Sequence, residues 1–177
     1  LKILNFFCSS YVKSLSYVDS FNNKLVSLLD IGFERSTLLI FNKKKLIHIN
    51  SIPIGGNHIT KDISNVLKLD INDSEKIKKA FNKSENEFSY YQEINESTDF
   101  IKHIVDNSIS IDVLKKVVLA RIEEIFDLIF KDLVNLNDFK NYENSLLVLT
   151  GNGSKLFDKN SFHLSDKYSF KEINYYE

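Results

Sequence analysis

The sequence predicts a mixed α/β fold, and two of its patterns lead to this expectation. The first pattern consists of three β-rich runs at residues 25–31, 37–41 and 45–54, separated by short turn segments. The second is an amphipathic stretch from Ile111 or Asp112 to about residue 134, in which apolar side chains recur at helical spacing. Consecutive strands joined by short turns form an antiparallel meander, so we expect a sheet with helices packed against it.

The composition is that of one or at most two globular units. The chain has 177 residues, of which 43% are hydrophobic and 27% are charged, and its formal net charge is -1. These values supply enough apolar side chains for a core and exclude a disordered chain. The only basic run, Lys43 to Lys45, lies between apolar segments and is typical of a solvated hairpin tip, so we expect no nucleic-acid partner. The scattered histidines lack the spacing of a metal site.

Cysteine usage and the apolar runs give an expectation about location. Cys8 is the single cysteine, so no internal disulfide can form and a reducing cytoplasm is expected. No apolar run approaches the roughly 18 residues that a membrane helix needs, and the first residues show no signal-peptide pattern. Because the sequence contains no methionine, we expect it to be a piece of a longer protein.

The remaining elements of the first part of the chain follow in order. An apolar run at residues 3–7 predicts a strand, and Ser9 or Ser10 can cap the helix that follows it. After the meander, Pro53 and the pair Gly55-Gly56 end the third strand. Apolar residues then recur at helical spacing, so a helix is expected directly after the glycines.

The second part predicts a helix, a polar stretch and a return to the sheet. Asp73 or Ser74 is expected to cap a helix, and a strand is possible at residues 88–94. Residues 145–150 have the apolar character of a buried strand, followed by a glycine turn and the start of another helix at residues 154–157.

One short segment has the residue types of a phosphate site. Asp30-Ile31-Gly32 ends the first meander strand, and the hydroxyl residues Ser36 and Thr37 open the next. A glycine turn at this place can direct backbone N–H groups at a phosphate, while Asp30 holds Mg²⁺ through water. An ordinary hairpin turn explains the same residues, and the motif alone does not decide between the two.

A second pair of features suits a nucleoside. The segment from Leu149 to Ser154 places small residues between a strand and a helix start, which leaves room for a flat base. A plain strand-to-helix connection is the alternative interpretation. Glu75 and Lys78 share one face of the predicted helix, where they can bond ribose hydroxyls and a ring edge or simply pair with each other.

The order of these pieces narrows the choice. After the Asp30 turn come IPIGGNHIT at residues 52–60, SEKIK at 74–78, ARIEEI at 120–125 and LTGNGS at 149–154. This order resembles the second half of the sequences of the FtsA family, the actin-like ATPases of bacterial cell division. The IPIGGNHIT and ARIEEI segments are the more specific ones, because sugar kinases and heat-shock chaperones of the same superfamily share turns like the others.

The resemblance implies a fold, a function and partners. The expected fold is the actin-like (RNase H-like) ATPase fold, with residues 1–68 and 145–177 in subdomain IIA and residues 69–144 in an inserted subdomain IIB. The implied function is an ATP-binding scaffold that polymerises and links the FtsZ ring to the cytoplasmic membrane, with ATP and Mg²⁺ as cofactors. The C-terminal peptide of FtsZ is expected on the helices after Asp73. The implied location is the inner face of the membrane at midcell, reached through a C-terminal amphipathic helix that this sequence does not contain.

The resemblance also assigns residues to the nucleotide. Those expected around the second phosphate loop and the phosphates are Asp30, Gly32, Phe33, Ser36 and Gly56, with Mg²⁺ on Asp30 through water. Those expected at the ribose, adenine and remaining adenosine surface are Glu75, Lys78, Gly151, Asn152, Gly153 and Ser154.

Departures from the family pattern bear on activity. Phe33, Glu34 and Arg35 stand where glycines and threonines are usual, and Glu34 would repel a triphosphate unless Arg35 or Mg²⁺ neutralises it. Asn152 replaces the middle glycine of the adenosine turn but tolerates a left-handed backbone. Ser9 stands where a carboxylate or amide would orient the attacking water, so hydrolysis is expected to be slow or absent. Alternatives are another ATPase of the superfamily, such as a sugar kinase or heat-shock chaperone, and an adaptor that has lost nucleotide binding.

Overall fold

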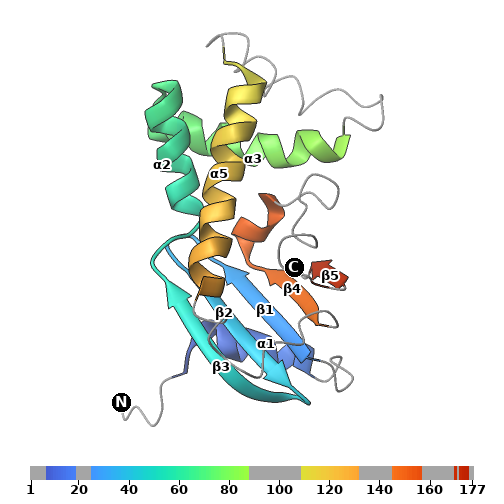
Figure 1. Ribbon diagram of the computed structural model, residues 1–177. Coiled ribbons are helices and arrows are strands. Elements are labelled where there is room, and N and C mark those ends of the chain that lie inside the picture. Colours follow the sequence, from blue (N-terminus) through green and yellow to red (C-terminus); the bar gives the residue numbers. More distant parts are fainter. Residues whose placement is uncertain are drawn as a thin grey trace.

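A computed structural model of the chain describes residues 7–18, 25–87, 109–131, 145–156, 170 and 172–175. The elements in chain order are α1 (Ser9–Val18), β1 (Leu25–Ile31), β2 (Ser36–Asn42), β3 (Lys45–Ile52), α2 (Gly56–Leu67), α3 (Ile71–Glu87), α5 (Ile111–Phe130), β4 (Leu146–Thr150), the 3-10 helix η5 (Asn152–Leu156) and β5 (Glu172–Tyr175). Figure 1 shows their arrangement. The strand expected at residues 88–94 lies outside the described residues, as do the last residues expected of the long helix and all but Phe7 of the run at residues 3–7.

The sheet has five strands in the order β3-β2-β1-β4-β5. β1, β2 and β3 pair antiparallel, as the meander predicted, and β4 joins the same sheet parallel to β1. Lys43 and Lys44 form the tip of the β2–β3 hairpin with φ angles of 48° and 66°. Positive φ at both central residues is the geometry of a type I′ turn, so the basic run is a hairpin tip, as expected.

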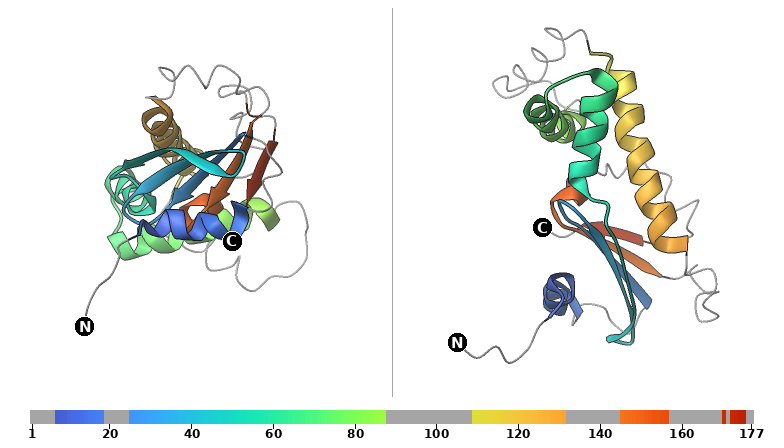
Figure 2. Two further views of the ribbon diagram at one scale, coloured as in Figure 1. Left: turned by 90° about the horizontal axis from the view of Figure 1, so that it is seen from below. Right: turned by 90° about the vertical axis from the view of Figure 1, so that its left-hand side faces the viewer.

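Both faces of the central strands are buried, which explains their nearly continuous apolar runs. Side chains of β1, β2 and β4 that point to one face form a core with α2, α3 and α5. Their neighbours in sequence point to the other face, where Tyr11 and Tyr17 of α1 pack on them. Helices therefore cover the sheet on both sides, with α1 opposite α5 (Figure 2). Side chains alternate between the faces of a strand, so strands covered twice lose the polar alternation of a surface sheet.

The helices begin where side chains or backbone groups can cap them. Ser110 accepts a hydrogen bond from the Val113 backbone N–H at the start of α5, which begins where the apolar stripe predicted. α3 begins earlier than expected because Asp70, rather than Asp73 or Ser74, caps it. The Asp70 carboxylate accepts the Asn72 N–H at 2.7 Å, and the Asp70 backbone oxygen accepts the Ser74 N–H at 2.9 Å.

α5 connects the sheet to the other helices. Six of its buried side chains belong to the core between the sheet, α2 and α3: Leu114, Val118, Ile122, Phe126, Ile129 and Phe130. Near its end, the backbone oxygen of Ile129 accepts a hydrogen bond from the Asn50 amide of β3 at 3.1 Å. At its middle, Arg121 forms a two-pronged ion pair with Asp62 of α2, at 2.6 and 2.9 Å.

Candidate functional site

Two glycine turns meet at one end of the sheet. The parallel register pairs Asp30 with Thr150, so the turn after β1 and the turn after β4 leave the sheet side by side. Gly151 has a φ of +86°, and a Cβ atom built on it would lie 2.5 Å from Oδ1 of Asp30. Only glycine combines this backbone angle with this close approach. The Gly151 turn therefore passes directly over the Asp30 side chain.

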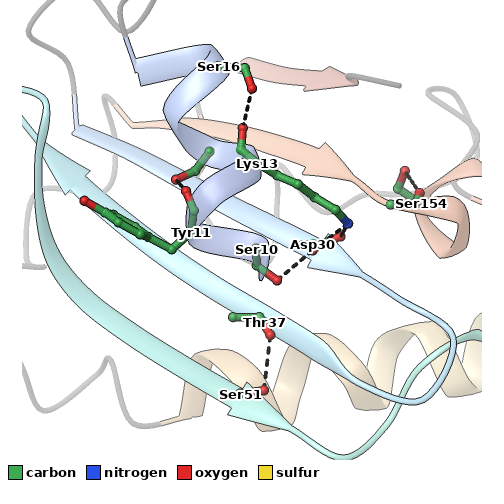
Figure 3. A network of polar contacts seen from close by, with 10 residues as sticks. Ser10, Tyr11, Lys13, Ser16, Asp30, Thr37, Ser51 and Ser154 are labelled. Carbon is green, nitrogen blue, oxygen red and sulfur yellow. Dashed lines mark hydrogen bonds and ion pairs between the residues drawn. The ribbon is translucent and has the colours of Figure 1, made fainter. Parts of the chain in front are cut away.

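The carboxylate of Asp30 is already paired at the end of β1. Ser10 Oγ donates to Oδ2 at 2.6 Å, and Lys13 Nζ lies 3.2 Å from Oδ1 and 3.1 Å from Oδ2. Both partners come from α1, which crosses the sheet beside Asp30 (Figure 3). The Asp30 side chain is 6% exposed, whereas that of Lys13 is 51% exposed. An ammonium group that reaches in from the surface thus neutralises a buried carboxylate.

The turn from Gly32 to Arg35 is joined to the start of α2 by backbone hydrogen bonds. Gly32 N donates to Arg35 O at 2.9 Å and closes the turn. Gly56 N then donates to Gly32 O at 2.9 Å, and Asn57 N donates to Phe33 O at 2.8 Å. A Cβ atom at Gly55 would lie 2.6 Å from Gly32 O, so this approach requires glycine. The first amides of α2 therefore point at the turn.

The side chains that follow Gly32 have partners of their own or are exposed to solvent. Glu34 accepts a hydrogen bond from the Asn57 side-chain amide at 2.7 Å. The buried Ser36 hydroxyl donates to Ile54 O at 2.7 Å, while Phe33 is 62% exposed. Glu34 is therefore held at the start of α2 instead of standing alone beside a phosphate.

Glu75 and Lys78 of α3 form a polar cluster with α2, in which Lys78 is buried and Glu75 is partly exposed. Lys78 Nζ lies 2.6 Å from a Glu75 carboxylate oxygen and donates to Gly56 O at 3.0 Å and Thr60 Oγ1 at 2.7 Å. The Thr60 hydroxyl in turn donates to Glu75. Burial works to raise the pKa of Glu75, but the hydrogen bonds from Lys78 and Thr60 and the nearby positive charges outweigh it and hold this pKa below its ordinary value.

The turn after β4 is compact and leads directly into η5. Gly153 and Ser154 are buried, and Asn152 is exposed. Ser154 donates to Gly151 O through both its backbone N–H, at 3.0 Å, and its hydroxyl, at 2.7 Å. This region lies near both β1 and α3. The structure thus gathers the residues expected at the phosphates, the ribose and the adenosine around one end of the sheet.

As the side chains lie here, Asp30 does not fit a hydrated Mg²⁺. That ion keeps several waters and is held through carboxylates in octahedral geometry. Ser10 and Lys13 already use the oxygens of Asp30, and an incoming ion would have to displace the Lys13 ammonium group. Nor does any group of three His, Cys, Asp or Glu side chains suited to a metal gather within the described part of the chain.

Sequence reasoning missed Ser10, Lys13 and Thr60. Ser9, which the resemblance places where a water-orienting carboxylate or amide is usual, is exposed, while the next residue, Ser10, is buried against Asp30. The signal for Ser10 and Lys13 was their spacing, since residues three apart share one face of a helix. Thr60 carried a comparable signal, because it lies one helical turn after Gly56 on α2.

A comparison with protein families decides where this chain belongs. A family model described as cell division protein FtsA matches residues 27–156, which is well over half of the chain. The chain belongs to the FtsA family. Cell division protein FtsA of Bacillus subtilis (strain 168) is 30% identical over 112 residues, which are 61% of this chain and 24% of that protein. FtsA of Rhizobium meliloti (strain 1021) is 29% identical over 135 residues, 72% of this chain and 29% of that protein. The chain spans less than a third of the length of these FtsA proteins.

Solved structures show that this FtsA-family chain has the actin-like fold. The crystal structure of MreB 5 of Spiroplasma citri, bound to AMPPNP, matches with a TM-score of 0.63 at 17% identity. The match covers 94% of this chain and 52% of that one. The predicted actin-like α/β fold and the FtsA resemblance are therefore both confirmed.

Proposed function

We propose that the protein is an ATP-binding, actin-like scaffold of bacterial cell division that polymerises and links the FtsZ ring to the cytoplasmic membrane. Family membership supports this proposal. The main support for ATP binding is the parallel pairing of β1 with β4. This pairing brings the Asp30 and Gly151 turns to the same end of the sheet. In open α/β sheets, ligands bind beyond the carboxyl ends of parallel strands.

The proposed contacts divide between the turns and α3. The residues assigned to the phosphate side are Asp30, Gly32, Phe33, Ser36 and Gly56. The residues assigned to the adenosine are Gly151, Asn152, Gly153 and Ser154. Glu75 and Lys78 would exchange part of their mutual bonding for ribose hydroxyls and a ring edge. ATP would arrive as its Mg²⁺ complex or without the metal.

The proposed organisation has two subdomains. Residues 1–68 and 145–177 would form subdomain IIA, because β1 to β3 and the later β4 and β5 belong to one sheet. Residues 69–144 would form subdomain IIB, which includes α3 and α5. The shared core of α2, α3 and α5 supports a firm attachment of the second subdomain to the first.

We expect slow hydrolysis at this site. Ser10 and Lys13 are the side chains of α1 that contact Asp30, and neither is a carboxylate or amide suited to orienting a water. Phosphoryl transfer also needs positioning from groups on every side of the triphosphate. A single-turnover assay on the full-length protein should show a rate far below one per second, and a rate of about one per second, within the ordinary enzyme range, would contradict the expectation.

The proposed protein partners are FtsZ and further copies of this protein. The C-terminal peptide of FtsZ would contact the surface of subdomain IIB after Asp73, as the family resemblance implies. Titrating this peptide, with a scrambled peptide as control, should perturb residues 70–144. Perturbation confined to the sheet would contradict the assignment. ATP should promote pelleting of the full-length protein as filaments. Equal pelleting with and without ATP would argue against a nucleotide-dependent polymer.

The proposed location is the inner face of the cytoplasmic membrane at midcell. Within the described residues, no helix combines the length and the apolar character needed to cross a membrane. Membrane contact would come from an amphipathic helix outside this sequence. Liposome flotation of the full-length protein with and without its C-terminal segment tests this point, and flotation that persists after the truncation would contradict it.

Equilibrium binding of ATP separates this proposal from its main alternative. An adaptor without nucleotide binding is favoured by one observation, since Asp30, Glu75 and Lys78 are all engaged in ion pairs within the protein. Saturable binding of ATP by the full-length protein would support the scaffold. Absence of binding at any concentration up to the millimolar range would support the adaptor.

A further inference from the structure

The pair between Lys13 and Asp30 lies at the residue to which the family resemblance assigns Mg²⁺ beside the phosphate groups. We propose that Lys13 is a phosphate-binding residue that takes the place of this metal, so that nucleotide binding by this protein does not depend on Mg²⁺. The inference rests on the proposed nucleotide binding and adds the residue that neutralises the phosphates. Its ligand class is any nucleoside di- or triphosphate whose base and sugar fit the site.

The geometry leaves one N–H donor of the Lys13 ammonium group free. A lysine ammonium group has three N–H donors. Lys13 Nζ directs two of them at the two oxygens of Asp30, at 3.2 and 3.1 Å. The third can donate to a phosphate oxygen, because the ammonium group lies at the end of the sheet where the Gly151 turn passes over Asp30. Asp30 then acts as the positioning residue, and Ser10 holds the carboxylate from the other side.

The charges at this end of the sheet favour the same assignment. An unpaired Asp30 would repel phosphate groups, and in many nucleotide sites a metal ion removes such repulsion. Here the Lys13 ammonium group already cancels the charge of Asp30. The Lys13 side chain is 51% exposed, so a ligand can reach it. Charge-assisted bonds from a lysine to phosphate are common in such sites.

A purely structural ion pair would look the same without a ligand, so the test must depend on phosphate. Adenosine, ADP and ATP differ in phosphate number but share the base and sugar. If Lys13 binds phosphate, its removal should weaken the binding of ADP and ATP and leave the binding of adenosine unchanged. If Lys13 only holds the fold, its removal should weaken all of them alike.

The experiment measures binding of adenosine, ADP and ATP to the full-length protein by calorimetry, in buffer with Mg²⁺ and in buffer with EDTA. For the natural protein, ADP and ATP affinities in EDTA should stay within about threefold of those in Mg²⁺. Lys13→Met should lower ADP and ATP affinity in EDTA about tenfold to a hundredfold, the usual range for a charged hydrogen bond. Mg²⁺ should then restore part of the loss, because Asp30 becomes available to the metal.

Matched variants isolate the charge from the side-chain shape. Lys13→Arg keeps the charge and should keep binding in EDTA, while Lys116→Met removes an exposed lysine of α5 and should change nothing. Circular dichroism and thermal unfolding establish that Lys13→Met is folded. The comparison of the natural protein in Mg²⁺ and EDTA needs no variant and stands if Lys13→Met does not fold.

Three results would overturn the inference. A loss of ADP and ATP affinity of tenfold or more for the natural protein in EDTA would mean that the metal is required, and the proposed ATP binding would stand. An equal loss for adenosine and ADP in Lys13→Met would reduce Lys13 to a structural role. Absence of binding by every ligand in both buffers would overturn the inference together with the proposed nucleotide binding.

Discussion

Gly151 is the residue at which the turn after β4 comes closest to β1. Gly151→Ala adds a Cβ atom at a φ of +86°, where it would meet the Asp30 carboxylate and the Ile31 backbone oxygen. We expect a loss of about 1–3 kcal/mol in the free energy of unfolding, the usual cost of a strained backbone position. Urea titration measures it, with Asn152→Ala as the exposed neighbouring control. A loss no larger than in the control would show that the turn can shift away from Asp30.

Glu75 predicts a dependence of stability on pH. Its pKa in the folded protein is lowered from an ordinary value of 4.5, so the folded state favours the charged form. Its contribution is therefore fully present above pH 4.5 and is lost as the pH falls through the lower pKa of the folded state. The stability difference between the natural protein and Glu75→Gln should shrink as the pH falls in this window.

Urea titrations at several pH values test the Glu75 prediction. Glu123→Gln, at an exposed position of α5, gives the cost of removing a surface carboxylate. A difference for Glu75→Gln that stays constant from neutral pH to below pH 4 would contradict the expected linkage.

The residue contacts at the site show what one sequence can and cannot predict. Asp30, Gly151 and their neighbours carry local signals, because a turn restricts which residue types can occupy it. The pair of Lys13 with Asp30 joins residues 17 positions apart on different elements. Its existence depends on how α1 lies over the sheet, and no pattern within either segment fixes that placement.

At the scale of elements, α2 and α5 are joined by the ion pair of Arg121 with Asp62. The hydrogen bond and charge of Asp62 raise the pKa of Arg121, so the pair favours the charged guanidinium group. Both side chains are about one quarter exposed, at 24% and 25%, which weakens the pair through solvent screening. A double-mutant cycle with Arg121→Ala and Asp62→Ala should give a coupling of about 1 kcal/mol that falls with added salt. A coupling of zero would mean that the helices are held together by apolar packing alone.

The apolar stripe of α5 should dominate the stability of the helical layer. Ile122 is fully buried in the larger core, whereas Leu128 on the same helix is 38% exposed. Ile122→Ala should cost about 2–5 kcal/mol, because it removes buried methyl groups and leaves a cavity. Leu128→Ala should cost far less. Thermal or urea unfolding compares them, and similar losses for both would contradict this view of the core.

The boundaries of an element could be predicted from the sequence where a long periodic pattern included them. The start of α5 was predicted because its apolar stripe is long, and the structure adds its cap, Ser110. The start of α3 was missed because several residues before it can cap a helix. The choice of Asp70 depends on the path of the chain after α2, where Lys68 adopts a φ of 57°.

For the whole molecule, the order of the strands predicts an order of local stability. β1 lies between β2 and β4 and is buried along almost its whole length, while β3 is an edge strand with alternating exposed side chains. Amide hydrogen exchange should therefore be slower in β1 than in the edge strand β3. Mass spectrometry of protease fragments after exchange measures this. Equal protection of the two strands would indicate that β3 is covered in solution.

The fold as a whole was more predictable than the site. The meander, the long helix and the returning strand each left a pattern, and their order identified the architecture. The actual strand order required the parallel pairing of β1 with β4, which joins residues more than a hundred positions apart. Such pairings depend on the assembled core and leave no local pattern in either strand.

The backbone hydrogen bonds between the Gly32 turn and the start of α2 have a consequence for evolution. Main-chain atoms form the attachment, so it survives exchange of the side chains at positions 33 to 35. Gly55 is the exception, since any larger residue there would collide with Gly32. The side chains of the turn can therefore be exchanged without loosening the attachment. The chemistry of the turn can therefore change during evolution while its main-chain attachment to α2 stays the same.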